Sequence, residues 1–310
     1  MHAHDWPFHY VNRLALQPKL DAVFGQANHL TDIFARELAA AAGTTNTLRV
    51  LSIGSGDCSL EILLSEVIWR DFNVTCVFTC FDPSDEGFLG ATRLIEAKKS
   101  AFRVIQQLPA EGTSFDAAFA HHSLHHVSDL EGLFTFVRRA IGPDGVFVIS
   151  DMIGRNGHQR WPEAKRLAGR LFSKLPSVLG AAPRDFIMRS DPPPSPTRTP
   201  LARSHVDLRR RRCDLAEYPD FDYSKCGGEP SPAFEGVRSQ DILPLLRTHF
   251  VFEKLVAFGG IAFEFVNHRL GQNFDRDKPG HKEFLVSRAG CARKGYERVW
   301  GGEMERRLAK

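Results

Sequence analysis

Two glycines separated by one residue, with an acidic residue directly after them, stand where a protein chain can hold a ligand. Gly54, Ser55 and Gly56 follow the apolar run Leu48–Ile53, and Asp57 comes next. Glycines allow a sharp turn and let the backbone approach a ligand closely. A buried strand, this turn and a helix that Asp57 would cap together form a unit that can cradle a ligand.

A second acidic residue stands where it could bind a sugar. Asp82 and Pro83 end the β-branched and aromatic segment 73–81, about 25 residues after the glycine turn. A carboxylate at the end of a second strand can accept hydrogen bonds from ribose hydroxyls. Without the glycine turn, the same two residues would indicate only an ordinary turn.

Histidines gather after the fourth apolar segment. His121, His122, His125 and His126 lie close together, and His158 lies further along the chain. The unperturbed pKa of histidine is near neutrality, so each is a candidate general base. We expect His122 and His158 to act at the site, whereas His125 and His126 are typical of residues that cap or pack against the next helix.

Polar groups also follow the fifth apolar segment. Arg155 and Asn156 would lie at the edge where a substrate could sit, and Arg155 could pair with a carboxylate or phosphate. We therefore count Arg155, Asn156 and His125 as candidate substrate contacts. A hydrogen-bonded turn leading into the next helix explains the same residues equally well.

The pattern of apolar residues places these groups at one edge of a sheet. Alternating strands and helices predict a parallel, doubly wound α/β sheet, which binds ligands at the carboxyl ends of its strands. Gly259 and Gly260 lie between two further apolar runs and predict a closing antiparallel hairpin, which would make seven strands. The predicted strands are 48–53, 73–81, 102–105, 115–120, 146–150, 251–258 and 261–266.

The sequence suggests five regions along the 310 residues. A core that binds the ligand is interrupted by an insertion rich in Pro and Arg, which we interpret as a lid. The predicted boundaries are a flexible N-terminus at 1–18, the core at 19–152, the lid at 153–236, the end of the core sheet at 237–270 and a helical tail at 271–310. Within them, helices are expected from Lys19 to Ala42, from Ser239 to Thr248 and from His281 to Arg288.

Composition argues against several classes of protein. The net charge of +3 gives no indication of a nucleic-acid partner. The six cysteines form no Cys-x-x-Cys pair, which is typical of free thiols in a reducing cytosol, and we expect no metal site. No apolar run approaches the ~18–20 residues of a membrane span, so we expect a cytoplasmic protein without a membrane partner.

The sequence resembles the class I S-adenosylmethionine-dependent methyltransferases, which have a Rossmann-like fold. The resemblance rests on Val50–Asp57, Cys80–Pro83, Phe115–Asp116 with Leu124–Val127, and Gly142–Gly145 before the fifth strand. The Leu-His-His element is similar to small-molecule enzymes of the ubiquinone and menaquinone C-methyltransferase type. Ser52 departs from the pattern, because many members have an acidic residue at this point.

The resemblance implies a set of cofactor contacts for S-adenosyl-L-methionine. The glycine turn would pack against the methionine part, Asp57 or the main chain would reach its amino group, and Asp82 would hold the ribose. Pro83 and Ser84 would lie beside the adenine. The complete set is Gly54, Ser55, Gly56, Asp57, Asp82, Pro83, Ser84, Gln106, Gln107 and His121.

The predicted function is methyl transfer to an oxygen, nitrogen or carbon atom of a small-molecule acceptor. Two alternatives remain: a methyltransferase-like protein that binds without catalysis, and an RNA or protein methyltransferase with Arg209–Arg212 as a docking patch. A nicotinamide oxidoreductase is disfavoured because Ser59 stands where its third glycine belongs. The sequence leaves the oligomeric state open, a homo-oligomer included.

Overall fold

The computed structural model describes residues 6–27, 29–154, 156, 166, 170, 178, 236–257 and 273–285. The described residues fall into two compact units, which we treat separately. Of the described residues, one unit holds those within 26–156 and 236–254, and the other holds 6–25, 166, 170, 178, 255–257 and 273–285.

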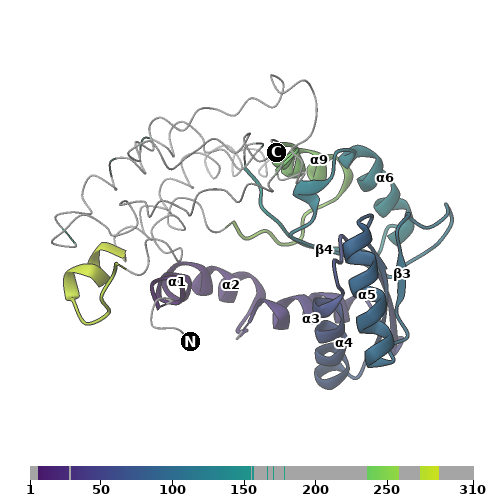
Figure 1. The fold of residues 1–310 in the computed structure, drawn as a ribbon, viewed down its shortest axis with the longest axis horizontal. Coiled ribbons are helices and arrows are strands. Elements are labelled where there is room, and N and C mark those ends of the chain that lie inside the picture. Colours follow the sequence, from purple (N-terminus) through teal and green to yellow (C-terminus); the bar gives the residue numbers. More distant parts are fainter. Residues whose placement is uncertain are drawn as a thin grey trace, which may run out of the picture. The chain divides into compact units, whose positions relative to one another are not determined.

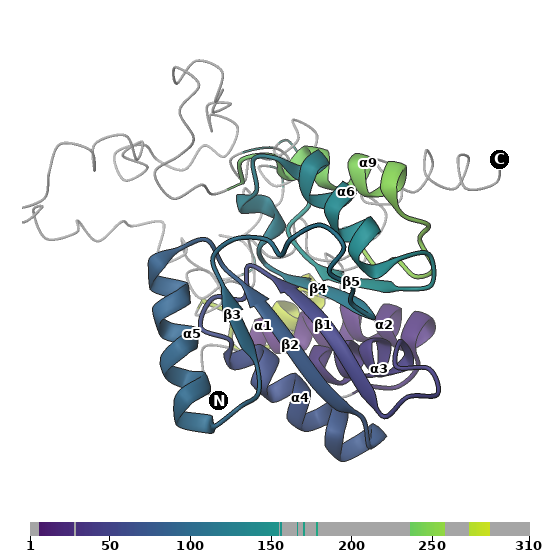
Figure 2. The same cartoon turned by 90° about the vertical axis from the view of Figure 1, so that its right-hand side faces the viewer.

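Five parallel strands form the sheet of the first unit, in the spatial order β3-β2-β1-β4-β5. Figure 2 shows β1 lying between β2 and β4. The strands span Thr47–Ile53 (β1), Thr75–Phe81 (β2), Arg103–Ile105 (β3), Ala117–His121 (β4) and Val146–Ser150 (β5). The five strands predicted before residue 152 are therefore confirmed, as is their parallel arrangement.

The register of the sheet brings the carboxyl ends of its strands level. Ile53 pairs with Phe81 of β2 and with Ala120 of β4, and Phe81 pairs in turn with Ile105 of β3. The chain moves outward from β1 to β3 and then returns to the other side of β1 as β4. Ligands of open α/β sheets bind at such a reversal, outside the carboxyl ends of the strands.

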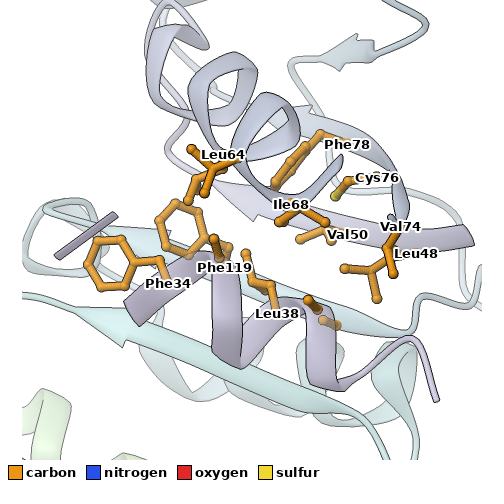
Figure 3. Packing of buried hydrophobic residues seen from close by; sticks show 14 of the residues in the cluster. Phe34, Leu38, Leu48, Val50, Leu64, Ile68, Val74, Cys76, Phe78 and Phe119 are labelled. Atoms are coloured by element: carbon orange, nitrogen blue, oxygen red, sulfur yellow. The ribbon is translucent and has the colours of Figure 1, made fainter. Parts of the chain in front are cut away.

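Three helices cover one face of this sheet: α3 (Leu30–Ala40), α4 (Ser59–Phe72) and α5 (Asp85–Lys98). Figure 3 shows the core between sheet and helices. Removing such apolar side chains from water is the main favourable contribution to folding. Buried members of this core include Phe34, Leu38, Leu48, Val50, Leu64, Ile68, Phe78 and Phe119.

The other face is covered by the short η2 turn (Leu124–His126), α6 (Leu130–Ile141) and α9 (Ser239–His249). Figures 1 and 2 both show α6 beside α9. Phe134 of α6 and Ile242 of α9 share a buried cluster with Leu51 and Ile53 of β1. The helix predicted from Ser239 is thus confirmed, and it packs against the core.

The predicted closing hairpin is not seen in the described residues. Residues 251–257 form no strand, and the sheet has five strands in the described part of the chain rather than seven. The side chains of this segment do alternate, since Val251 is 92 % exposed while Phe250 and Phe252 pack on the α6 side of the core. The second apolar run, 261–266, lies outside the described residues, as does nearly all of the predicted lid.

The second unit begins with helices where the sequence suggested a flexible terminus. The chain forms α1 (Trp6–Val11), the π-helical η1 (Asn12–Leu16) and α2 (Gln17–Phe24). The helix expected from Lys19 to Ala42 is therefore two helices, because Gly25 takes a positive φ of 74° and ends α2. The next helix, α3, begins at Leu30, and the Asp32 carboxylate in its first turn accepts a hydrogen bond from the His29 amide at 3.0 Å.

The same unit contains a short C-terminal helical segment. Residues 279–285 are helical, which confirms the predicted helix as far as Leu285. Phe274 stacks on Phe284 with ring centroids 6.0 Å apart, and the Asp275 amide donates to His281 Nδ1 at 2.8 Å. The five region boundaries stay predictions. None of the helices described in either unit is long and apolar enough to cross a membrane.

Candidate functional site

The glycine turn after β1 is fastened to the end of β2. The amides of Gly54 and Ser55 donate to the Phe81 carbonyl at 2.8 and 3.2 Å, and the Gly56 amide donates to Asp82 Oδ2 at 2.9 Å. Both glycines have positive φ, 64° and 54°, a conformation that strains other residues. The structure thus brings the two motifs singled out from the sequence into direct contact.

Gly54 also lets the loop after β4 approach closely. A Cβ atom at this position would overlap the Cβ of Ser123. The Ser123 hydroxyl donates to the Ile53 carbonyl at 2.7 Å, which closes the contact from the other side. The ends of β1 and β4 therefore form one tightly packed surface.

Asp82 is nearly buried and holds the beginning of the next helix. Its Oδ1 atom accepts hydrogen bonds from the Ser84 amide at 2.9 Å and the Ser84 hydroxyl at 2.5 Å. The Ser84 hydroxyl in turn accepts from the Gly87 amide at 3.1 Å and caps α5. An ionised carboxylate offers about four acceptor positions, so Asp82 retains capacity for a ligand hydroxyl.

The remaining residues expected near the adenine lie at the ends of β2 and β3. Gln106 Nε2 donates to Asp85 Oδ1 at 2.9 Å, while Pro83 and Gln107 are exposed. The structure therefore places these residues at one edge, and their contacts with a cofactor stay predictions.

Asp57 lies one residue before the N-cap position of α4, whereas we expected it to be the N-cap residue itself. The helix α4 starts at Ser59, and Cys58 precedes it with a positive φ of 62°. Asp57 Oδ1 accepts from the Ser59 hydroxyl at 2.6 Å and the Ser59 amide at 3.0 Å. These bonds lower the pKa of the exposed Asp57 carboxyl. Asp57 thus still satisfies an amide of the first helical turn.

A buried carboxyl group behind the turn is the residue that sequence reasoning missed. Glu61 is 3 % exposed, and its Oε1 accepts a hydrogen bond from the Ser52 hydroxyl at 2.6 Å. Burial raises the pKa of Glu61 to about 7; the Ser52 bond opposes the rise, and the charges of Asp57 and Asp82 add to it. The second oxygen, Oε2, has no hydrogen-bond partner.

A signal for Glu61 was present in the helical spacing. Leu63, an apolar residue of the same helix, is 45 % exposed, so the buried face of α4 lies elsewhere. Glu61 instead lies at the i, i+3, i+7 spacing with Leu64 and Ile68, both fully buried. An acid on the buried stripe, five residues after the glycine turn, could have been recognised.

His121 and His122 lie at the end of β4 in different surroundings. His121 is half-buried beside Phe34, with ring centroids 5.5 Å apart, and its pKa is lowered first by burial and then by the neighbouring His122. His122 is exposed, and its backbone has a positive φ of 51°. Such a conformation in a residue other than glycine is strained, and strained residues cluster at functional sites.

His125 lies inside the protein and ties two loops together. Its Nδ1 is 2.6 Å from Asp151 Oδ1, and both side chains are almost completely buried. Asp151 Oδ2 also accepts from the amides of Ser123 and Leu124. Burial raises the pKa of Asp151, but the bond and charge of His125 and these amides outweigh it, so the net pKa is lowered. The predicted contact of His125 with an acceptor stays a prediction.

The remaining candidates are only partly described. Asn156 Oδ1 accepts a hydrogen bond from the Gln240 amide at 3.2 Å, next to the start of α9. Arg155 and His158 lie outside the described residues. In the described part of the chain, no three His, Cys, Asp or Glu side chains gather as a metal site would require.

Unpartnered polar atoms test whether this edge fits the expected cofactor. Four buried side-chain atoms in the described residues have no hydrogen-bond partner, and three lie around the turn: Ser55 Oγ, Glu61 Oε2 and His121 Nδ1. Buried polar atoms are normally satisfied, so this concentration indicates a polar ligand. The amino-acid end of S-adenosylmethionine carries an ammonium and a carboxylate group, which provide both donors and acceptors. The residues therefore fit the group.

Comparison with known proteins agrees with this reading of the fold. Residues 11–176, more than half of the chain, match a family described as methyltransferase domain. No curated protein matches the chain.

Several solved structures are similar at low identity. The YcgJ protein from Bacillus subtilis has 22 % identity and a TM-score of 0.34, with 47 % of this chain and 59 % of that chain covered. A SAM-dependent methyltransferase from Aquifex aeolicus has 15 % identity and a TM-score of 0.30, with 44 % of this chain and 68 % of that chain covered. A SAM-dependent methyltransferase from Thiobacillus denitrificans, solved with S-adenosyl-L-homocysteine, has 19 % identity and a TM-score of 0.30, with 45 % of this chain and 52 % of that chain covered. The chain thus spans 59 % of the length of the first of these structures, which is less than two thirds.

Proposed function

The chain belongs to the methyltransferase-domain family, whose typical cofactor is S-adenosylmethionine, and we propose that it transfers a methyl group from this cofactor to a small-molecule acceptor. One observation carries the proposal. The glycine turn is hydrogen-bonded to Asp82, and unpartnered polar atoms belong to the turn itself (Ser55), to the first turn of α4 (Glu61) and to the end of β4 (His121). This is the arrangement that a ligand with a ribose and an amino-acid end would complete.

The bound cofactor supplies a methyl group activated on a sulfonium sulfur, so the protein mainly positions and desolvates the partners. Asp82 and the turn would hold the cofactor, with Pro83, Ser84, Gln106 and Gln107 at its adenine side. An oxygen or nitrogen acceptor loses a proton when it is methylated. His122, exposed at the end of β4, would accept that proton.

The charge of the edge favours a small molecule over a nucleic acid. In the described residues, the carboxyls of Asp57, Glu61 and Asp82 surround the turn, and no Lys or Arg occurs in 54–57, 82–84, 106–107 or 121–126. Nucleic-acid binding depends on basic groups that neutralise phosphates. The Arg209–Arg212 patch of the alternative lies outside the described residues.

Calorimetric titration with S-adenosylhomocysteine tests the cofactor assignment. We expect micromolar binding by the wild type and at least about tenfold weaker binding by Asp82→Ala, since hydrogen bonds to a charged group contribute about 1.5–3 kcal/mol. Asp71→Ala is the matched control, because Asp71 is an exposed carboxylate at the far end of α4 that contacts Arg70. Equal binding by Asp82→Ala and Asp71→Ala would refute the assignment of the site.

Turnover separates an enzyme from a protein that only binds. The wild type should form S-adenosylhomocysteine with at least one member of a panel of hydroxylated, aminated and carbon-nucleophile small molecules. His122→Ala should lower kcat by about 10²-fold or more with an oxygen or nitrogen acceptor and leave cofactor affinity unchanged. Binding without turnover on any acceptor would favour the non-catalytic alternative.

A further inference from the structure

Glu61 is an acid placed where burial makes charge costly. Its carboxyl lies in the first turn of α4, behind the glycine turn, with one oxygen bonded to Ser52 and the other without a partner. An unpaired buried carboxylate is strongly unfavourable, and so is a buried polar atom without a hydrogen bond. A purely structural role does not account for such a group, because an apolar side chain at this point of the helix would pack without the cost.

The groups around Glu61 offer it no positive charge. On its own side of the sheet lie the thiols of Cys80 and Cys58, and Asp57 and Asp82 lie on the adjoining turn and strand end. Among the described residues, no ion pair involves Glu61. No described element that faces the carboxyl therefore presents a cationic side chain to it, and only the Ser52 hydroxyl and the amide end of α4 favour the charged form. A cationic group on a bound ligand would supply the opposite charge that the Glu61 carboxylate lacks.

The position of Ser52 indicates which part of the ligand supplies that cation. Ser52 is two residues before Gly54, and its hydroxyl links β1 to Glu61. The Glu61 carboxyl is thereby held against the end of β1, two residues before the glycine turn. Because Ser52 leads into the turn, the charge acts on whatever group lies against Gly54–Gly56.

We propose that Glu61 provides the counter-charge for the ammonium group at the amino-acid end of the cofactor, and that cofactor binding releases the proton of Glu61. The inference rests on the proposed function, since it assumes that the ligand is S-adenosylmethionine or its product. No bond other than the O–H bond of Glu61 is broken, and the proton leaves to solvent. Cofactor affinity therefore becomes dependent on pH.

The direction of that dependence follows from the charges. Without ligand, burial holds the pKa of Glu61 at about 7, so the group is largely neutral below neutrality. An ammonium nearby favours the carboxylate and lowers this pKa. Binding near pH 7 should then release about half a proton. Well below pH 7, the affinity for the cofactor should decrease by up to about tenfold for each unit by which pH is lowered, and above pH 7 it should no longer change with pH.

Calorimetry in two buffers of different ionisation enthalpy measures the released protons directly. We would titrate wild type, Glu61→Gln and Glu66→Gln with S-adenosylhomocysteine between pH 5.5 and 8.5. Glu61→Gln keeps the shape and an acceptor for Ser52 but removes the charge. Glu66→Gln makes the same change at an exposed position of α4. We expect Glu61→Gln to bind about tenfold more weakly at pH 8, without proton release, and Glu66→Gln to behave as the wild type.

Methylthioadenosine, which lacks the amino-acid end, is the ligand control. It should bind wild type and Glu61→Gln equally and release no proton. Wild type that binds S-adenosylhomocysteine without proton release, or Glu61→Gln that retains release, would overturn the role of Glu61 and leave the proposed function intact. Wild type that binds neither ligand would refute the proposed function itself. Even if Glu61→Gln does not fold, a wild type that binds S-adenosylhomocysteine without proton release would overturn the role of Glu61.

Discussion

Replacing Gly54 by alanine should separate two costs that the glycine turn imposes. The first is conformational: at a φ of 64°, a residue with a Cβ costs about 1–2 kcal/mol. The second is steric, because the new methyl would overlap the Cβ of Ser123. Forcing an extra methyl into a packed interior costs about 1–3 kcal/mol. Gly54→Ala should therefore destabilise the fold by about 2–5 kcal/mol.

Gly56→Ala is the matched control for the steric cost. Gly56 has a similar φ of 54°, but nothing lies within 4 Å of a Cβ built there. Its substitution should cost only the conformational part, about 1–2 kcal/mol. Urea denaturation followed by far-ultraviolet circular dichroism measures both variants against the wild type.

A double-mutant cycle identifies the partner of the clash. Ser123→Gly removes the Cβ that an alanine at position 54 would meet, at the cost of the hydroxyl bond to the Ile53 carbonyl. The double variant should be more stable than the sum of the two single effects predicts, by about 1 kcal/mol or more. If Gly54→Ala costs no more than Gly56→Ala, or if the two substitutions are additive, the close packing of β1 against the loop after β4 is wrong.

Three further predictions concern buried groups outside the turn. His125→Ala should cost about 1–3 kcal/mol in urea denaturation, because it leaves the buried Asp151 carboxyl without its His125 hydrogen bond. A variant as stable as wild type would contradict the pairing. Because the folded-state pKa of Asp151 is lowered, its contribution to stability is present above the usual carboxyl pKa and is lost as pH falls below about 4. The free energy of unfolding of Asp151→Asn should therefore decrease less than that of the wild type as pH is lowered through this range. Burial raises the pKa of the Cys76 thiol, and the pKa of Cys80 is raised first by a hydrogen bond with Cys58 and then by burial. Mass spectrometry after treatment with iodoacetamide at pH 8 should therefore find Cys58, Cys76 and Cys80 unmodified until urea is added. Labelling of any of these three cysteines in the native protein would refute their burial.

Local sequence was sufficient for the parallel sheet. Each strand from β1 to β5 is a short apolar run bounded by a turn signal, and parallel order follows from the helices between them. The glycine turn and Asp82 could be paired because the carboxyl ends of neighbouring strands share an edge. Their hydrogen bond through the Gly56 amide is a consequence of that arrangement.

The features that failed depend on partners that a sequence does not name. Val251 is exposed between Phe250 and Phe252, which pack on the core, but such alternation arises from any extended segment that packs one side on a core. A strand also needs a hydrogen-bonded neighbour, and this segment has none in the described residues. Glu61 was overlooked because charge predicts exposure, whereas its place on the stripe of Leu64 predicts burial. The Asp151–His125 pair joins loops that are 26 positions apart in the chain, with no local signal.

The hydrogen bond from Ser123 to Ile53 also has a consequence for the order of folding. It joins residues 70 positions apart, so the edge that would receive the cofactor is complete only after β4 has paired with β1. Contacts of such long sequence separation form slowly, because the intervening chain must be ordered first. A ligand stabilises only the state that binds it. A nascent chain that stops short of residue 117 therefore gains nothing from the cofactor, however abundant the cofactor is, and must rely on its helices and on β1–β3 alone.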